Sequence, residues 1–425
     1  MTIISHLINS NFQQKSDKAA FFCAISFMFF IPSSTALMNL FIFLTLIFIL
    51  LSGNLINKIN MVLSNPVTLA ALIIYFFLLI STFWAIDNSD SIRILKKYNE
   101  LWYLALILPL FNSEKRRNIG INAYLISMGI VLTGVYLMFF NIVPIIEYSL
   151  WNRAHHFNID GGFASHILTN ILMAFAMFIS AQKIFFSKLI LKPAYLIFFI
   201  LSAYYVFFIS TGTSGQVLGA CLILLFIIQH GRIRSVLIIP GILIFVAAIA
   251  IANRPFYNKT VTLIGDNDSF QTLTTKIQER YHHATSTDTA GNNTRPRIYY
   301  NALKLIRLEP WIGSGVGSYE ASLKKYQPEF HAATVIAKKN PHNEYLMMSA
   351  QLGLVGLVLL LNLFYAQAKY SERISNQELK NISQGLVVLI VIGCMGNSML
   401  LDSREGHFWA FFSALLFSSL SRELE

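Results

Sequence analysis

The sequence predicts an all-α polytopic membrane protein with about 12 transmembrane helices and one large, mainly helical loop outside the bilayer. Of its 425 residues, 55% are hydrophobic and only 12% are charged, and the mean hydropathy is +0.57. The apolar runs are continuous over roughly 17 to 25 residues, which is the length of a membrane-spanning helix. This composition excludes a soluble globular protein. The lack of alternation between apolar and polar residues excludes a transmembrane β-barrel.

The apolar runs predict the order of the spans. The first run, Phe21 to Leu51, is too long for one span and is interrupted at Pro32-Ser33-Ser34, so it predicts a helical hairpin. Further spans are expected at residues 67–85, 99–112, 120–144, 164–181, 194–210, 215–230, 235–252, 343–366, 384–400 and 406–421.

Lysine and arginine residues indicate the orientation of these spans. They gather in alternate loops, as at Lys115-Arg116-Arg117, whereas the loops at 32–34 and 210–212 carry none. Short cytoplasmic loops are enriched in such residues, so both termini are expected in the cytoplasm, although the basic connection between Asp87 and Glu100 is an exception. The net charge of +11 is therefore attributed to topology and not to nucleic-acid binding.

One long insertion, residues 253–341, follows the ninth expected span and falls on the side opposite the cytoplasm. It contains twelve Lys and Arg against seven Asp and Glu. Long loops cross the membrane largely regardless of charge, so two interpretations remain: a solvated basic face, or an anion site. The simplest organisation is a single integral membrane domain, 1–425, with this loop capping a site between spans.

The segment Asn340-Pro341-His342-Asn343-Glu344-Tyr345-Leu346 opens the tenth expected span. Pro341 suits the first turn of a helix, which would place His342 on that turn at the outer mouth of the bundle. An imidazole can accept a proton from a hydroxyl at neutral pH, and Glu344 could orient it. The alternative is an interfacial histidine that caps a helix.

Two arginines, Arg295 and Arg297, begin a helix-like segment of the insertion. Guanidinium groups bind phosphate oxygens in a bidentate manner, and two of them can bracket a diphosphate. The alternative is that both are ordinary surface residues. Near the C-terminus, Asp402 and Arg404 stand between two apolar runs, where charges are costly unless they pair or line a site.

Nucleotide and metal sites are not supported by the remaining motifs. The glycine-rich segment Trp311-Ile312-Gly313-Ser314-Gly315-Val316-Gly317 lacks the preceding strand of a dinucleotide-binding unit, and we expect it to form a tight, exposed turn. The histidines have no metal-ligand spacing, and the three cysteines fall inside apolar runs. No cofactor is expected.

Together these motifs resemble the O-antigen ligase and polymerase superfamily. The resemblance rests on the NPHNEYL segment with Gly353 eleven positions after His342, on the arginine-containing helix, and on the EPWIGSGVGSYE turn. It implies a GT-C-like, metal-independent glycosyltransferase at the periplasmic face of a bacterial inner membrane. In the ligases, a glycan moves from an undecaprenyl diphosphate carrier to a sugar hydroxyl of lipid A–core. His342 then resembles the catalytic base, and Arg295 the arginine that holds the diphosphate.

The resemblance has one departure. Family members carry an arginine after the seventh span, whereas this chain has Thr213 or Ser214 at that place. Hydroxyl groups bring no charge to a diphosphate, so Arg153, Arg404 or Lys96 could supply the missing cation. Asn343 and Glu344, beside the histidine, complete the expected binding residues.

Three other functions stay open at this stage. A polymerase that extends the carrier-bound glycan and an oligosaccharyltransferase that modifies protein hydroxyls would share the donor half of the site. A transporter of lipid-linked glycan would need no covalent chemistry, but the chain lacks the repeated halves and mid-span ionisable residues that transporters tend to show.

Overall fold

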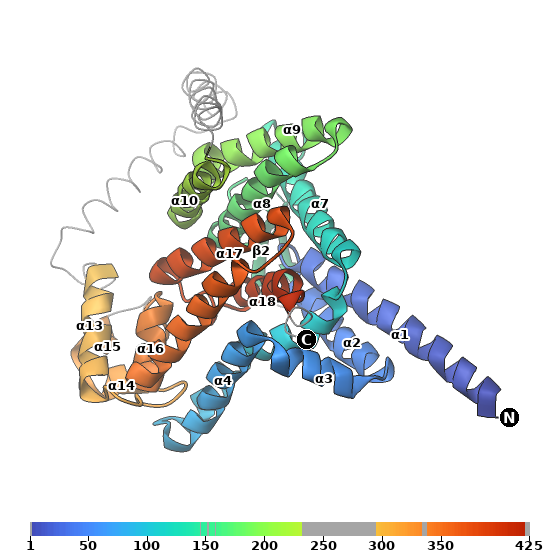
Figure 1. The fold of residues 1–425 in the computed structure, drawn as a ribbon. Helices are drawn as coiled ribbons and strands as arrows, with labels where there is room; N and C mark the ends of the chain where they lie inside the picture. The colour runs from blue at the N-terminus through green and yellow to red at the C-terminus, as the bar shows by residue number, and fades with distance from the viewer. Residues whose placement is uncertain are drawn as a thin grey trace.

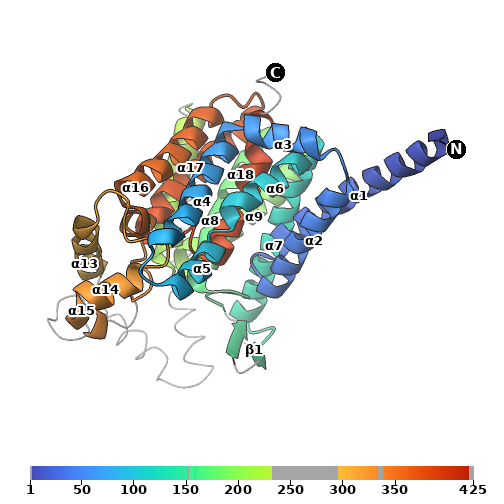
Figure 2. The same cartoon turned by 90° about the horizontal axis from the view of Figure 1, so that it is seen from below.

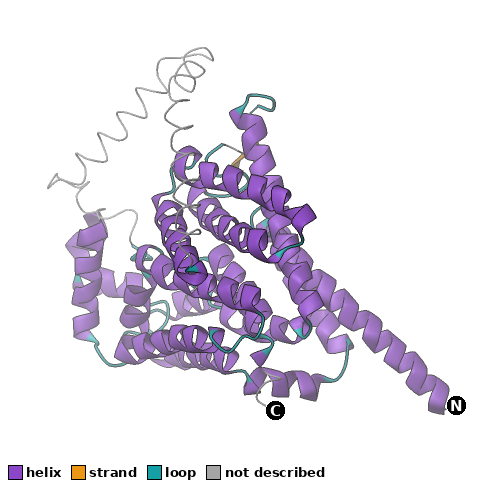
Figure 3. Cartoon of the chain, turned by 45° about the horizontal axis from the view of Figure 1, so that its top comes forward, coloured by secondary structure: helices purple, strands orange, loops and turns teal. Residues whose placement is uncertain are grey.

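The structure is a computed structural model that describes residues 2–144, 146–150, 153–157, 159–231, 295–333 and 338–420. It is a bundle of helices with one small two-stranded hairpin, so the predicted helical membrane fold is confirmed (Figures 1 and 3). The α-helices are α1 (Thr2–Phe30), α2 (Thr35–Leu51), α3 (Leu55–Ser64), α4 (Pro66–Ser81), α5 (Asn88–Lys97), α6 (Glu100–Ile107), α7 (Glu114–Phe139), α8 (His166–Phe186), α9 (Lys192–Tyr204), α10 (Thr213–His230), α13 (Arg295–Leu308), α14 (Tyr319–Tyr326), α15 (Pro328–Ala333), α16 (Glu344–Ser371), α17 (Gln377–Gly396) and α18 (Ser403–Phe417). Short 3-10 helices occupy Thr82–Trp84, Leu108–Phe111 and Leu189–Leu191, and a π-helix, Tyr205–Ile209, extends α9. Strands β1 (Ile146–Leu150) and β2 (Arg153–Phe157) pair antiparallel.

The expected count of about 12 spans is not established. Within the described ranges, seven helices are long and apolar enough to cross a membrane, or eight if α2 and α3, bent by 118°, count as one span. Two expected spans correspond to the shorter helices α6 and α18, of 8 and 15 residues. The span expected at 235–252 lies outside the described residues.

Local capping explains where several helices begin. The hairpin of α1 and α2 is confirmed, and its second helix starts where Ser34 Oγ accepts a hydrogen bond from the backbone N–H of Leu37 at 3.3 Å. Asn65 caps α4 in the same way, and Pro66 stands at the first helical position, where its missing N–H costs nothing. The short helix α3 between them was not predicted.

The centre of the bundle is formed by α8 and α18, which are buried along most of their lengths. Figure 1 shows α18 surrounded by the other helices. Ring contacts join this centre to α7, through an aromatic cluster of Tyr124, Phe175, Phe408, Phe411 and Phe412. Such closely packed side chains fix the positions of the central helices relative to one another.

The two ends of the bundle differ (Figure 2). At one end, called the cap end below, α5, α13, α14, α15 and the β-hairpin extend beyond the spans, and the opposite end carries α3 and the C-terminus. The cap end also holds the starts of α8, α10, α16 and α18 and the end of α17. Segments far apart in the sequence therefore meet there.

The glycine-rich turn is buried from Gly313 to Gly317, although Trp311 and Ile312 before it are exposed, so the expectation of an exposed turn was wrong for the glycines. It docks against a break in α16 at Gly353, whose φ of +63° interrupts the helical hydrogen bonds. The N–H groups of Ser314 and Gly315 donate to the carbonyls of residues 350 and 351, and the N–H groups of residues 354 and 355 donate to Pro310 and Trp311. The turn thus replaces the bonds that the helix loses, which is why it cannot stay in solvent.

Candidate functional site

The segment before α16 places His342 just outside the helix. The expectation that Pro341 occupies the first helical turn was wrong, because α16 starts at Glu344 with Asn343 as its N-cap. Asn343 Oδ1 accepts a hydrogen bond from the N–H of Leu346 at 3.0 Å. His342 precedes the cap with a φ of +53°, a left-handed conformation that costs free energy outside glycine.

Hydrogen bonds hold this unusual backbone in place. Asn340 Oδ1 accepts from the N–H of His342 at 2.8 Å and from the hydroxyl of Ser398 at 2.7 Å. The His342 side chain is half-buried, and its Nε2 atom is buried with no hydrogen-bond partner in the described part of the chain. This nitrogen therefore has an unused hydrogen-bonding site next to the start of α16.

Glu344 does not orient His342. Its carboxylate is fully buried and accepts hydrogen bonds from the Tyr98 hydroxyl at 2.9 Å and from the N–H groups of Leu400 at 2.9 Å and Leu401 at 3.3 Å. The interpretation of Glu344 as the partner of the histidine therefore gives way to a structural role. It ties α16 to the segment between α17 and α18.

Asp402 is the carboxyl group that interacts electrostatically with His342. Burial raises the pKa of Asp402 above its usual value, and the nearby charges of His342 and Lys97 oppose that rise. Lys97 lies at the end of α5, where the sequence had suggested the neighbouring Lys96 as a spare cation. The side chains of Asp402 and His342 therefore lie close enough for their charges to interact.

Arg295 lies against the end of α17, next to the segment that contains His342. It is the first residue of α13, and a Cβ placed on Gly396 would lie 3.3 Å from its Nη1 atom, so the guanidinium covers the end of α17. One turn later, the hydroxyl of Tyr299 donates to the carbonyl of Met395 at 2.8 Å. The same carbonyl accepts the side-chain amide of Asn343 at 3.0 Å. The last residues of α17 thus bring Arg295 and the segment of His342 together.

Arg297 does not share this placement. An α-helix turns by about 100° per residue, so Arg297 lies roughly opposite Arg295 on α13. Both arginine side chains are exposed, but no contact joins Arg297 to the end of α17 in the described part of the chain, and the next residue, Ile298, is buried. Of the two predicted arginines, the structure therefore brings only Arg295 to the histidine segment.

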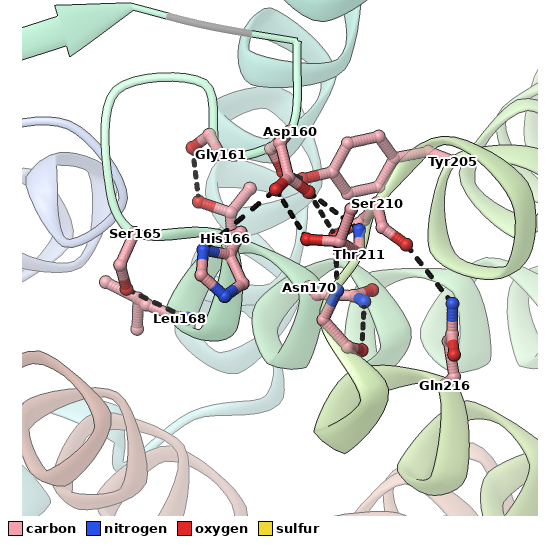
Figure 4. A network of polar contacts seen from close by, with 12 residues as sticks. Asp160, Gly161, Ser165, His166, Leu168, Asn170, Tyr205, Ser210, Thr211 and Gln216 are labelled. Carbon is pink, nitrogen blue, oxygen red and sulfur yellow. Dashed lines mark hydrogen bonds and ion pairs between the residues drawn. The ribbon is translucent and has the colours of Figure 1, made fainter. Parts of the chain in front are cut away.

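The start of α10 is organised around a carboxylate (Figure 4). Asp160 accepts hydrogen bonds from the Ser210 hydroxyl at 3.2 Å and from the N–H and hydroxyl of Thr211 at 2.7 and 2.6 Å. The Nδ1 atom of His166, the first residue of α8, lies 4.0 Å from the same carboxylate. An acidic group at this position repels an anion.

Thr213 and Ser214 stand immediately after this network, in the first turn of α10. Thr213 is exposed and Ser214 is half-buried. Hydroxyl groups beside a carboxylate are suited to the hydroxyl groups of a sugar, which both donate and accept hydrogen bonds. They are poorly suited to a diphosphate.

The other predicted cations lie elsewhere. Arg404, in the first turn of α18, donates from Nε and Nη2 to the hydroxyl of Thr35 at 3.0 and 2.7 Å. Arg153 begins β2, and its side chain lies outside the described part of the structure.

Sequence reasoning missed Tyr299 and Asn340 as positioning residues. Tyr299 follows Arg295 by four positions, the spacing that places two side chains on one helix face. Asn340 precedes a proline, a pattern typical of a side chain that bonds the backbone two residues later. Both signals are local and common, so neither alone could have identified the site.

The arrangement combines a potential base with a cation and an acid. His342 Nε2 can take a proton, Arg295 can hold a negatively charged leaving group, and Asp402 can stabilise the protonated imidazole. This set is suited to transfer of a group from a phosphate ester to a hydroxyl.

Comparison with known families agrees with this chemistry. No curated protein matches the chain significantly. Residues 196–361 match the family model described as O-antigen ligase, and the matched segment includes α10, α13, Arg295 and His342. The similarity of this segment to the family indicates, in general terms, an enzyme that transfers glycans. Residues 196–361 are therefore similar to the O-antigen ligase family, in agreement with the resemblance of the sequence to the O-antigen ligase and polymerase superfamily.

Proposed function

We propose that this protein is an O-antigen ligase that moves a glycan from undecaprenyl diphosphate to a sugar hydroxyl of lipid A–core. The reaction takes place at the periplasmic face of the inner membrane, under a cap formed by the insertion 253–341. The observation that carries the proposal is the unpartnered Nε2 atom of His342 inside the matched family segment. Both termini then lie in the cytoplasm.

In the proposed mechanism, His342 acts as the general base. Its Nε2 atom takes the proton of the acceptor hydroxyl while the acceptor oxygen bonds to the anomeric carbon of the glycan. The bond between that carbon and the diphosphate oxygen breaks, and the diphosphate leaves beside Arg295. Asp402 stabilises the imidazolium until the proton returns to solvent or to the leaving diphosphate.

We assign the glycan of the donor to the start of α10, at the cap end. Thr213, Ser214 and Asp160 offer hydroxyl and carboxylate groups, which suit sugar hydroxyls better than phosphate. This assignment explains why a diphosphate-binding arginine is absent there. Arg404 and Arg153 remain candidates for further contacts with the substrates.

The experiment is a transfer assay with the purified full chain, undecaprenyl diphosphate-linked glycan and lipid A–core, in the presence of EDTA. We expect glycan on the core, and a loss of about 100-fold or more for His342→Asn. Asparagine tolerates a left-handed backbone, so this variant keeps the local structure. Product from the variant at the wild-type rate would contradict the base assignment.

The same assay tests the acceptor. Elongated glycan on the carrier, with none on the core, would replace the ligase by a polymerase. Transfer only to a protein hydroxyl would replace it by an oligosaccharyltransferase.

A further inference from the structure

The face of α13 that points away from the bundle combines apolar, aromatic and basic side chains. We call Tyr300, Leu303, Lys304, Arg307 and Leu308, together with Trp311 and Ile312, the outer stripe. All seven side chains are exposed, with exposed fractions of 58% for Tyr300 and 69% for Trp311. Figures 1 and 2 place α13 at the periphery of the molecule, beside α16. A large apolar surface of this kind marks contact with a partner or with lipid.

The outer stripe continues into the lipid-facing surface of α16. The carbonyls of Pro310 and Trp311 accept hydrogen bonds from the N–H groups of Leu354 at 2.8 Å and Val355 at 3.2 Å. Leu354 and Val355 belong to a candidate membrane span and are 47% and 39% exposed. Exposed aliphatic side chains on a span face lipid, so Trp311 lies next to lipid as well.

The length of α16 sets the depth of Trp311. The break at Gly353 divides α16, and we take the continuous part after it as the segment that crosses the bilayer, in place of the span expected at 343–366. From Leu354 to Ser371 this part extends about 27 Å at 1.5 Å per residue, close to the thickness of the hydrocarbon core of a bilayer. Leu354 therefore lies near one boundary of that core, and Trp311 lies beside it. Tryptophan and tyrosine are enriched at this boundary because their rings are amphipathic.

The basic residues of the outer stripe extend from this boundary toward the headgroups. Lys304 Nζ lies over the Tyr300 ring, 4.5 Å from its centre, and both side chains are exposed. Arg307 is exposed one turn further along, and Glu309 is the acidic neighbour. Two cations against one anion favour a negatively charged partner.

We propose that the outer stripe of α13 binds the bilayer surface at the cap end, with Lys304 and Arg307 contacting the phosphate groups of anionic phospholipids. Trp311 and Ile312 enter the boundary of the hydrocarbon core. This contact anchors α13, and with it Arg295, at a constant height above the membrane.

The first test measures thermal stability of the full chain in lipid nanodiscs with and without phosphatidylglycerol in phosphatidylcholine. We expect the anionic lipid to raise the unfolding midpoint of the wild type by roughly 2–4 °C. The double variant Lys304→Gln, Arg307→Gln should lose most of that rise. Lys324→Gln, which removes an exposed charge from α14, should keep it. An equal rise in all three proteins would overturn the proposal.

The second test locates Trp311 directly. The difference in emission between the wild type and Trp311→Phe isolates one indole, and phospholipids brominated on the acyl chain should quench it. Quenching by aqueous iodide, with no effect of the brominated lipid, would place Trp311 in solvent and contradict the proposal. Neither test depends on transfer activity, so the two outcomes are independent of the proposed enzyme function.

Discussion

His342 combines a strained backbone with the role of general base that we propose for it. Its left-handed backbone is held by Asn340, whose Oδ1 accepts a hydrogen bond from the N–H of His342. Such conformations cost on the order of 1–3 kcal/mol and persist only where the surroundings hold them. Arg295 and Arg297 show a second residue-scale effect, because two positions along a helix place them on opposite faces.

The two arginines provide a matched comparison. Arg295→Ala should lower kcat/KM for the lipid-linked donor by about 10- to 100-fold, since it removes a charged hydrogen-bonding group from the leaving diphosphate. Arg295→Lys should recover only part of the loss, because a point charge does not replace the guanidinium fork. Arg297→Ala, on the opposite helix face, should stay within about twofold. Equal rates for the alanine variants would remove Arg295 from the donor site.

The carboxyl groups at the start of α18 predict a pH dependence of stability. Burial, followed by the nearby charge of Asp402, raises the pKa of Glu405 from 4.5 to about 8, against the opposing effects of its own backbone N–H and Arg404. The folded protein therefore holds this proton when the unfolded chain has released it. Stability should fall as pH rises from 4.5 to about 8, by at most about 1.4 kcal/mol per pH unit.

Thermal unfolding in detergent at pH 5 and pH 8.5 checks this effect. The wild type should unfold at a lower temperature at pH 8.5. Glu405→Gln carries no titrating group at this position, so its two unfolding temperatures should lie closer together. An unchanged difference would assign the pH dependence to other groups.

At the scale of elements, the turn between α13 and α14 and the break in α16 form one unit. Gly313 has a φ of +66°, and a Cβ placed on it would lie 2.4 Å from the carbonyl carbon of Gln351. A further bond runs from the N–H of Gly317 to the side chain of Gln351 at 2.7 Å. The turn therefore couples α13, which carries Arg295, to α16.

Gly313→Ala should destabilise this unit by about 2–4 kcal/mol, because it combines backbone strain with a steric clash. We expect a lower unfolding temperature and loss of transfer activity. Gly129→Ala is the control, since a Cβ there would make only an ordinary contact of 3.7 Å with Phe198. If both variants were equally stable, the docking of the turn would be incorrect.

At the scale of the whole molecule, the two ends of the bundle are built differently. The cap end holds α13 to α15 with the candidate site, and the other end holds α3 and the C-terminus (Figure 2). The positively charged loops predict that the second end faces the cytoplasm. The cap would then face the periplasm, where the proposed substrates meet.

Cysteine labelling with a membrane-impermeant maleimide checks this orientation. Lys324→Cys on α14 and Asn57→Cys on α3 are both exposed positions. In spheroplasts, the first should react before lysis and the second only after it. The wild type, with its three native cysteines, gives the background. The reverse labelling order would invert the proposed topology.

The sequence by itself determined the membrane class, the hairpin at the start and the histidine motif. These are properties of contiguous residues: an apolar run, a Pro-Ser-Ser interruption, and a short polar segment before a helix. Bilayer solvation acts on each run independently, so no long-range contact is needed to predict a span. The resemblance to a family rested on the same contiguous motifs.

Only the tertiary structure decided which of these residues cooperate. Glu344 was assigned to His342 because they are neighbours in sequence, yet its carboxylate bonds Tyr98 and the segment after α17. Arg295 meets the histidine segment through the end of α17, and the glycine turn is buried because α16 breaks where it docks. Each of these facts depends on packing between distant segments. A local sequence pattern carries no information about such packing.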